Sequence, residues 1–279
     1  MIRCSMGATV MSRLRCIVCV APLLVAPVAV AETIEFGFGT DKPPYVYENE
    51  GRGLEYDIVQ AAMREAGISL NVRHLPIDRL HLTLEHGELD AIASTNIQSG
   101  LSNVAYSDVV LYYQNVAIAL ASRGLVVECI EDLSNLSVSS FQSARRLLGG
   151  AYAKMAAANP RYREEPRQIT RSRLLYSGRV DVVVADIRIH EQLSKQASAE
   201  VDVSQPITVY PIFPRTPYRI GFRDAELRDR FNRGLAAVRA SGEYAAIEER
   251  YAADEPEKAL SGVTHVVNGA VRSAAGSER

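Results

Sequence analysis

Polar side chains that could hold a small charged molecule follow three separate apolar runs of the chain, residues 34–38, 89–93 and 180–185. The side chains concerned are Asp41, Tyr45, Tyr47, Ser94, Thr95 and Asp186. Each apolar run is typical of a buried strand, and in open α/β sheets ligands bind beyond the carboxyl ends of the strands. Carboxylates can pair with a cation and tyrosine rings can face one, so these residues indicate a binding site for a small polar or cationic molecule.

The first of these strand ends continues into a stiff loop. Pro43 and Pro44 each fix their own φ and restrict the residue before them. The loop therefore presents Asp41 and the tyrosines with little ordering cost on binding. The polar triplet from Ser94 to Asn96 at the second strand end also fits ordinary turn chemistry.

The second half of the chain offers a further candidate pair, Ser140 and Gln142. They lie at the turn into a predicted helix over residues 144–158, where free backbone N–H groups and the helix dipole favour an anion. The following stretch, residues 161–173, is dense in Arg and Glu. Such a run is typical of a solvated face, and a binding patch is the alternative.

The spacing of apolar residues predicts the elements that position these groups. Residues 57–66 have helical spacing, with Asp57 as a candidate N-cap, and a second helix has Asp78 as its candidate N-cap. With the strands around them, the order strand-helix-strand-helix-strand implies a parallel sheet with right-handed crossovers. Residues 111–120 are predicted as one long strand, and the pattern restarts after residue 123 as a second α/β unit.

Composition argues against several classes of function. The chain has 279 residues, a formal net charge of −2 and no basic stretch, so a nucleic-acid partner is not expected. The five histidines show no metal-ligand spacing, and Cys129, the one cysteine after residue 31, is expected to be a small buried hydrophobic residue. We therefore expect no metal, no cofactor and no catalytic residue.

The first 31 residues have the features of a secretory signal peptide. Three arginines precede an apolar segment over residues 17–30, which ends in a small-x-small pattern before Glu32. The segment is shorter than the ~20 residues of a spanning helix. We therefore expect cleavage after Ala31 and a secreted protein, with a membrane anchor as the alternative.

Four groups of short motifs follow one another in an order that is typical of a known family. They are Gly39-Thr40-Asp41 with Pro43-Pro44-Tyr45 and Gly53 to Asp57, Leu89-Asp90-Ala91-Ile92 with Tyr106-Ser107-Asp108, Gly178 to Asp186, and Arg223-Asp224 with Gly242, Tyr244 and Tyr251. In these motifs the chain resembles the bacterial periplasmic solute-binding proteins of family 3, the polar amino-acid type. The resemblance covers about residues 34–251.

The resemblance implies an α/β protein with a two-lobed periplasmic-binding-protein-like fold of type II, each lobe a mostly parallel sheet flanked by helices. Residues 32–118 and 215–251 would form the first lobe and residues 119–214 the second, with hinges near 117–122 and 212–217. The lobes would close over a ligand. Residues 252–279 are rich in small and polar residues, and we expect a mostly disordered tail.

The resemblance also implies roles for the candidate residues. Asp186 would hold the ammonium of an α-amino acid, and the pocket would be lined by Ser94, Thr95, Tyr45 or Tyr47, Ser140 and Gln142. In the family, an arginine soon after the polar triplet holds the ligand carboxylate, but residues 96–105 contain no basic residue. Arg79 could replace it or could be a surface residue. Otherwise Asp41 and Asp186 would suit a cationic or neutral ligand.

Three functions remain open from the sequence. The first is a monomeric binding protein that delivers a small polar solute to an inner-membrane transporter permease. The second is a sensory or partner-binding module on the same fold. The third is a dehydratase-type enzyme, which would need a general acid or base such as Asp41 or Asp186. We expect the first, with no enzymatic activity.

Overall fold

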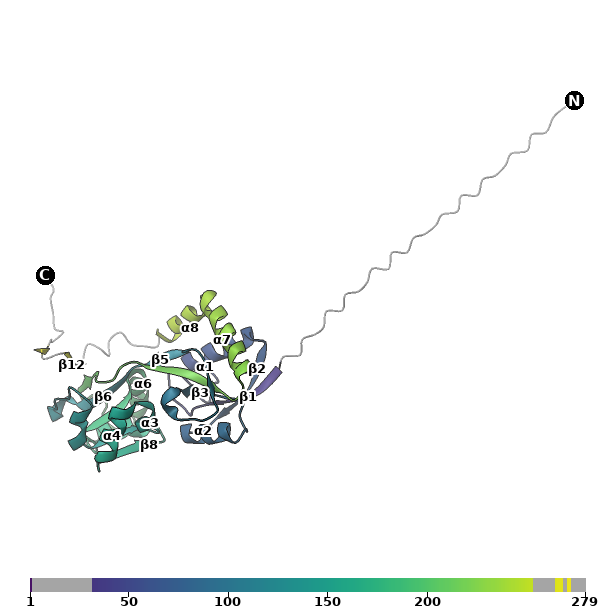
Figure 1. Cartoon of the computed structure of the whole chain (residues 1–279). Helices are drawn as coiled ribbons and strands as arrows, with labels where there is room; N and C mark the ends of the chain where they lie inside the picture. Colours follow the sequence, from purple (N-terminus) through teal and green to yellow (C-terminus); the bar gives the residue numbers. More distant parts are fainter. Residues whose placement is uncertain (2–31, 253–263, 268–269, 272–279) are drawn as a thin grey trace. The chain divides into compact units, whose positions relative to one another are not determined.

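The computed structural model describes Met1 and residues 32–252, 264–267 and 270–271 (Figure 1). The predicted signal peptide lies outside the described residues, apart from Met1. The chain divides into two units, Met1–Val30 and Ala31–Arg279, and all described helices and strands belong to the second. Within the described residues, no helix is both long enough and apolar enough to cross a membrane.

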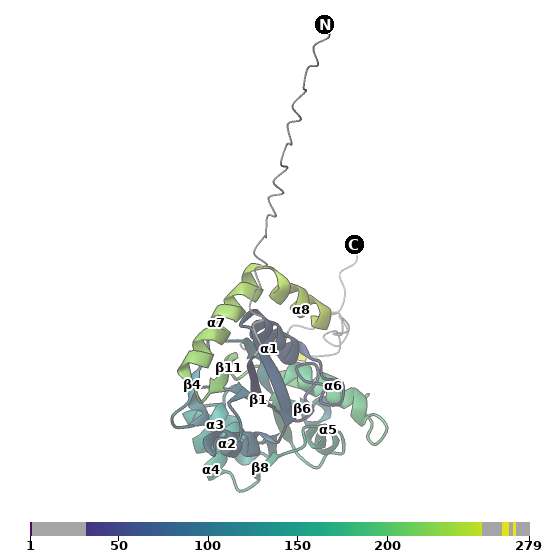
Figure 2. The ribbon, with the colours of Figure 1, turned by 90° about the vertical axis from the view of Figure 1, so that its right-hand side faces the viewer.

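The first of two sheets has the strand order β2-β1-β3-β11-β4, and β5 also pairs with β11. Its strands are β1 (Glu32–Phe38), β2 (Ile68–His74), β3 (Ala91–Thr95), β4 (Ala105–Tyr106), β5 (Leu111–Tyr113) and β11 (Thr216–Phe222). The helices around it are α1 (Leu54–Glu65), α2 (Ile77–Glu85), α7 (Ala225–Ala240) and α8 (Glu243–Ala252) (Figure 2). We call these elements the first lobe.

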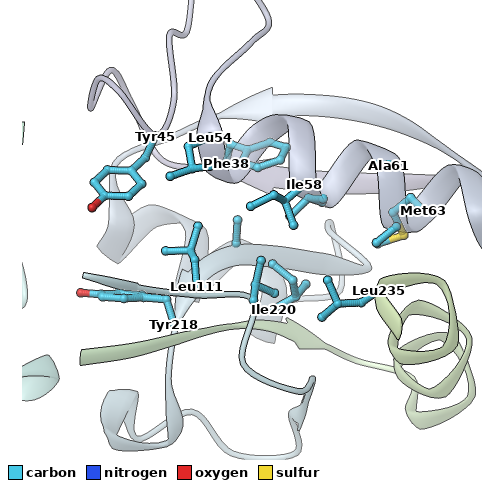
Figure 3. Close-up of a cluster of buried hydrophobic side chains, with 14 of the residues drawn as sticks. Phe38, Tyr45, Leu54, Ile58, Ala61, Met63, Leu111, Tyr218, Ile220 and Leu235 are labelled. Carbon is cyan, nitrogen blue, oxygen red and sulfur yellow. The ribbon is translucent and has the colours of Figure 1, made fainter. Parts of the chain in front are cut away.

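Buried side chains hold the helices of the first lobe against the two faces of its sheet. Phe38 of β1 is fully buried and belongs to one cluster with Ile58 of α1 and Leu235 of α7 (Figure 3). On the opposite face of β1, a Cβ added to Gly37 would lie 2.4 Å from the Leu80 side chain of α2. The glycine therefore lets α2 pack directly against the sheet.

The second sheet has the strand order β13-β12-β10-β6-β9-β7-β8. Its strands are β6 (Asn115–Leu120), β7 (Val138–Phe141), β8 (Tyr162–Glu165), β9 (Val182–Asp186), β10 (Ile207–Tyr210), β12 (Thr264–Val267) and β13 (Ala270–Val271). The helices that follow its strands are α3 (Ala144–Leu147), α4 (Gly150–Ala158), α5 (Ile169–Tyr176) and α6 (Ile187–Ala197). We call these elements the second lobe. Short 3₁₀ helices cover Ile97–Ser99, Ala121–Arg123 and Glu131–Asn135.

Both sheets are mixed, whereas mostly parallel sheets were expected. Strands β1, β2 and β3 run parallel, as do β7, β8 and β9. However, β11 runs antiparallel to β3, and β6 runs antiparallel to β9 and β10. These two antiparallel strands are the ones that enter each sheet directly after the chain crosses from the other lobe, so no βαβ crossover fixes their direction.

The chain crosses between lobes at Gln114, earlier than the boundary after residue 118 that the sequence suggested. The apolar run 111–120 is two strands, β5 in the first sheet and β6 in the second. Most residues of both strands are buried, so the apolar pattern shows no break where the chain changes lobes. The chain returns over residues 211–215, between β10 and β11.

Several predicted helix boundaries were wrong. Helix α1 begins at Leu54 after Gly53, so Asp57 is not its N-cap and instead accepts a hydrogen bond from the hydroxyl group of Tyr251. The N-cap of α2 is Pro76, and Asp78 lies in the first turn. The predicted helix 144–158 is divided into α3 and α4 at Gly149, whose φ of 91° does not continue a helix.

Three predictions concern single residues and the tail. Cys129 is exposed, whereas a buried thiol was expected; its backbone N–H donates to Asp132 in a surface turn. Most of the predicted tail 252–279 lies outside the described residues, but β12 pairs in parallel with β10. Its sequence, Thr-His-Val-Val, is rich in β-branched residues, which favours a strand beside an open sheet edge.

Candidate functional site

A cavity of about 60 Å³ lies between the two lobes, beyond the carboxyl ends of β1, β3, β7 and β9. Its wall includes Gly39, Thr40, Lys42, Ser94, Tyr113 and Tyr218 of the first lobe and Asn115, Phe141, Gln142, Glu165, Gln168 and Asp186 of the second. Sites for small molecules usually have about 300–1,000 Å³. The cavity is therefore smaller than a typical small-molecule site, and we expect a ligand to enter when the lobes separate.

A buried ion pair between Lys42 and Glu55 lies on the first-lobe side of the site. Lys42 donates from Nζ to Glu55 Oε2 at 2.7 Å, to Tyr113 OH at 3.0 Å and to Ser94 Oγ. Glu55 also accepts from the backbone N–H of Ser94 at 2.9 Å and from the Tyr113 hydroxyl at 3.0 Å. All three donors of the ammonium group are in use, and the two charges cancel. Lys42 therefore has no free donor for a ligand.

Three neighbouring tyrosine rings connect this ion pair with the second lobe. The ring centroids of Tyr45 and Tyr113 are 4.0 Å apart, and those of Tyr113 and Tyr218 are 4.3 Å apart. Figure 3 shows Tyr45 and Tyr218 at one end of the apolar cluster, with their hydroxyl groups pointing away from it. The Tyr45 hydroxyl donates to Asp186 Oδ2 at 3.2 Å and so bridges the two lobes.

Asp186 ends β9, caps α6 and lies in the cavity wall with 2% of its surface exposed. Its Oδ1 accepts from the backbone N–H groups of Arg188 and Ile189 at 3.0 and 3.1 Å. Its Oδ2 accepts from the backbone N–H of Gln114 at 2.8 Å. Burial raises the pKa of this carboxyl from 3.8 to about 6, because desolvation outweighs these hydrogen bonds. A cation in the cavity would favour the charged form.

A second set of contacts joins the lobes at the amino end of α2. Asp78 of the first lobe accepts from Arg146 Nη2 at 2.5 Å and from the hydroxyl group of Ser143, both in the second lobe. Ser143 takes a φ of 66°, and its backbone N–H donates to Glu164 at 2.7 Å. These contacts favour the closed arrangement of the lobes.

Of the nine residues predicted for the site, the cavity wall contains three, Ser94, Gln142 and Asp186. Three more are buried beside it, namely Tyr45, Thr95 and Ser140. The Oε1 of Gln142 and the hydroxyl groups of Thr95 and Ser140 have no hydrogen-bond partner in the described part of the chain.

The other three predicted residues are not part of the cavity wall. Asp41 exchanges hydrogen bonds with the loop residue Glu48. The ring of Tyr47 lies under the guanidinium of Arg52, at 3.9 Å. Arg79 is exposed on α2, so its geometry fits the surface interpretation rather than replacement of the missing arginine.

Lys42, Glu55 and Tyr113 were missed from the sequence. One signal was present, because Glu55 lies three residues before Ile58 and so falls on the buried stripe of α1. A single acid on an apolar stripe indicates a buried cationic partner, since charged residues are almost never fully buried unless paired. The identity of that partner depends on the loop after β1, which the helical pattern does not specify.

A family model that describes bacterial extracellular solute-binding proteins, family 3, matches residues 34–254, which span both lobes. The chain belongs to this family. This solute-binding protein is 26% identical over 215 residues to a protein of Neisseria gonorrhoeae described as a probable histidine-binding protein. The match covers 73% of this chain and 75% of that protein.

Solved structures share the fold. An ABC uptake transporter substrate binding protein from Streptococcus pneumoniae with bound histidine has a TM-score of 0.62 and 18% identity, over 78% of this chain and 92% of its own. A histidine kinase sensor domain with similarity to periplasmic binding proteins has a TM-score of 0.66 and 20% identity, over 78% of this chain and 95% of its own. These likenesses confirm the predicted periplasmic-binding-protein-like fold.

Proposed function

We propose that this solute-binding protein captures an amino acid between its lobes and delivers it to an ABC transporter in the inner membrane. The observation that carries the proposal is Asp186, a buried carboxylate in the cavity wall at the junction of the lobes. An ammonium group placed against it would pair with a charge that burial otherwise destabilises. Tyr45 bonds to the same carboxylate from the first lobe, so both lobes would surround the ligand.

The choice of an amino acid draws on the relatives as well as on the site. The Neisseria gonorrhoeae protein is described as a probable histidine-binding protein. The Streptococcus pneumoniae protein is described as an ABC uptake transporter substrate binding protein, and its structure contains bound histidine. The family is extracellular by its description. We place this chain in the periplasm after cleavage at Ala31, as a monomer whose partners are the ligand and a membrane permease, and we propose binding without catalysis.

The test is a thermal-shift screen of the secreted chain against amino acids, starting with histidine, arginine and glutamine. A ligand at 100 times its Kd adds ~2.7 kcal/mol of stability, which raises the Tm by a few degrees. Asp186→Asn should abolish the shift. Asp229→Asn, at an exposed acid of α7 paired with Arg228, should leave it unchanged. If no amino acid shifts the wild-type Tm, the proposal fails.

Sensing is the second candidate function, favoured by the likeness to the kinase sensor domain. Both functions begin with ligand capture and differ in the protein that responds to closure. Uptake of the labelled ligand should fall when the protein is deleted from cells if it serves a transporter. Unchanged uptake together with an altered transcriptional response to the ligand would support sensing instead.

A further inference from the structure

Arg171 is a fully buried arginine in a stretch that the sequence suggested was a solvated face. It is the third residue of α5 in the second lobe, and 2% of its surface is exposed. Its Nη2 donates to Gln168 Oε1, whereas Nε and Nη1 have no hydrogen-bond partner among the described residues. No carboxylate of the described residues lies within ion-pair distance of it. A buried charge without a partner costs several kcal/mol, so a missing anion is the natural explanation.

The guanidinium lies directly behind the cavity wall. Gln168, which accepts its hydrogen bond, is part of that wall. Phe141 is also part of the wall, and its ring centroid is 6.0 Å from the guanidinium carbon. The carboxamide of Gln168 therefore contacts the buried cation and also lines the space where a ligand would lie. Burial lowers the pKa of Arg171 to about 10, so the group stays charged at neutral pH.

Two other cations near the cavity, Lys42 and Arg188, are engaged elsewhere. Lys42 uses all three of its donors on Glu55, Tyr113 and Ser94. Arg188 lies over the ring of Tyr45 and donates to the carbonyl oxygen of Tyr251. Glu165, the acid in the wall whose charge acts on Arg171, is 3.0 Å from Arg163 and so has its own partner.

We propose that Arg171 binds the carboxylate of the ligand after the side chain of Gln168 moves aside. This inference rests on the proposed function, in which Asp186 holds the ammonium group. The substrate class is then a zwitterion, with its cationic group against Asp186 and its carboxylate deeper in the second lobe. Once Gln168 moves aside, Nη2 is released and forms with Nε a side-on pair of donors that matches the two oxygens of a carboxylate.

The experiment compares each amino acid with the amine that lacks only its carboxylate, histidine with histamine and arginine with agmatine, by titration calorimetry. The wild type should bind at least one amino acid about 100-fold more tightly than its amine, the scale for truncating one partner of a buried charge pair. Arg171→Met should bring that ratio close to one. Arg79→Met, at an exposed arginine, should leave the ratio at its wild-type value.

A second variant keeps the test decisive if Arg171→Met does not fold. Gln168→Glu is isosteric and places a carboxylate permanently against Arg171, so the amino acid should bind weakly while its amine keeps its wild-type affinity. Wild-type amino-acid affinity in Arg171→Met or in Gln168→Glu would overturn the role of Arg171 and leave the proposed function intact. A wild type that binds none of the amino acids would refute the proposed function, and this inference with it.

Discussion

Replacing Asp186 with asparagine should change how the stability of the protein depends on pH. The folded-state pKa of Asp186 is about 6, above the ordinary value of 3.8. Between these values the folded protein holds the proton more tightly than the unfolded chain does. The stability that this group contributes is therefore complete at low pH and is lost as pH rises through the folded-state pKa. Each pH unit corresponds to about 1.4 kcal/mol, so the difference of roughly two units costs the wild type about 3 kcal/mol by pH 7.

Urea unfolding at intervals from pH 4 to pH 7 measures this effect. The free energy of unfolding of the wild type, minus that of Asp186→Asn, should fall by about 2.4 kcal/mol across this range, because the unfolded-state carboxyl is already partly ionised at pH 4. Asparagine keeps a carbonyl oxygen that can cap α6, so the variant should fold. Asp229→Asn, at the exposed acid on α7, serves as the control and should follow the wild type. If the curves of wild type and Asp186→Asn run parallel, the carboxyl does not titrate as its burial implies.

Three further predictions test the framework of the site. Lys42→Met should lower the free energy of unfolding by about 3–5 kcal/mol because Glu55 stays buried without its cation; adding Glu55→Gln should recover most of the loss, and no recovery in urea unfolding would argue against the ion pair. Gly53→Ala should lower the Tm by several degrees, since φ is 142° and the new Cβ would lie 2.2 Å from the Tyr45 carbonyl oxygen; an unchanged melting curve would contradict this. Asp78→Ala removes contacts between the lobes and should raise the radius of gyration in X-ray scattering without added ligand; an unchanged radius would show that these contacts do not hold the lobes together.

Local pattern was enough for three of the strands that carry the site. The apolar runs before Asp41, Ser94 and Asp186 are β1, β3 and β9, and all end at the cavity. The crossing at Gln114 could not be found in this way, because β5 and β6 belong to different sheets yet are similarly apolar. An apolar pattern shows that a strand is buried, but it does not show to which sheet the strand belongs.

The charged part of the site depends on contacts between residues far apart in the sequence. Lys42 meets Ser94 and Tyr113 across 52 and 71 residues, a separation that no local spacing encodes. Arg171 was hidden for a different reason. It stands among many charged neighbours in a stretch with the composition of a surface, and only the packing of α5 shows that its side chain points inward.

The hydrogen bonds of Gln114 link the carboxylate of the binding site to both segments that connect the lobes. Its N–H donates to the carboxylate of Asp186, and its side-chain amide donates to the carbonyl oxygen of Phe213 on the returning crossing. The group that would hold the charge of a ligand is thus one hydrogen bond from the first interlobe segment and two from the second. Neutralising or protonating that carboxylate would alter the geometry of both connections at once. A membrane partner that senses the angle between the lobes would then detect the electrostatic state of the site without touching the ligand.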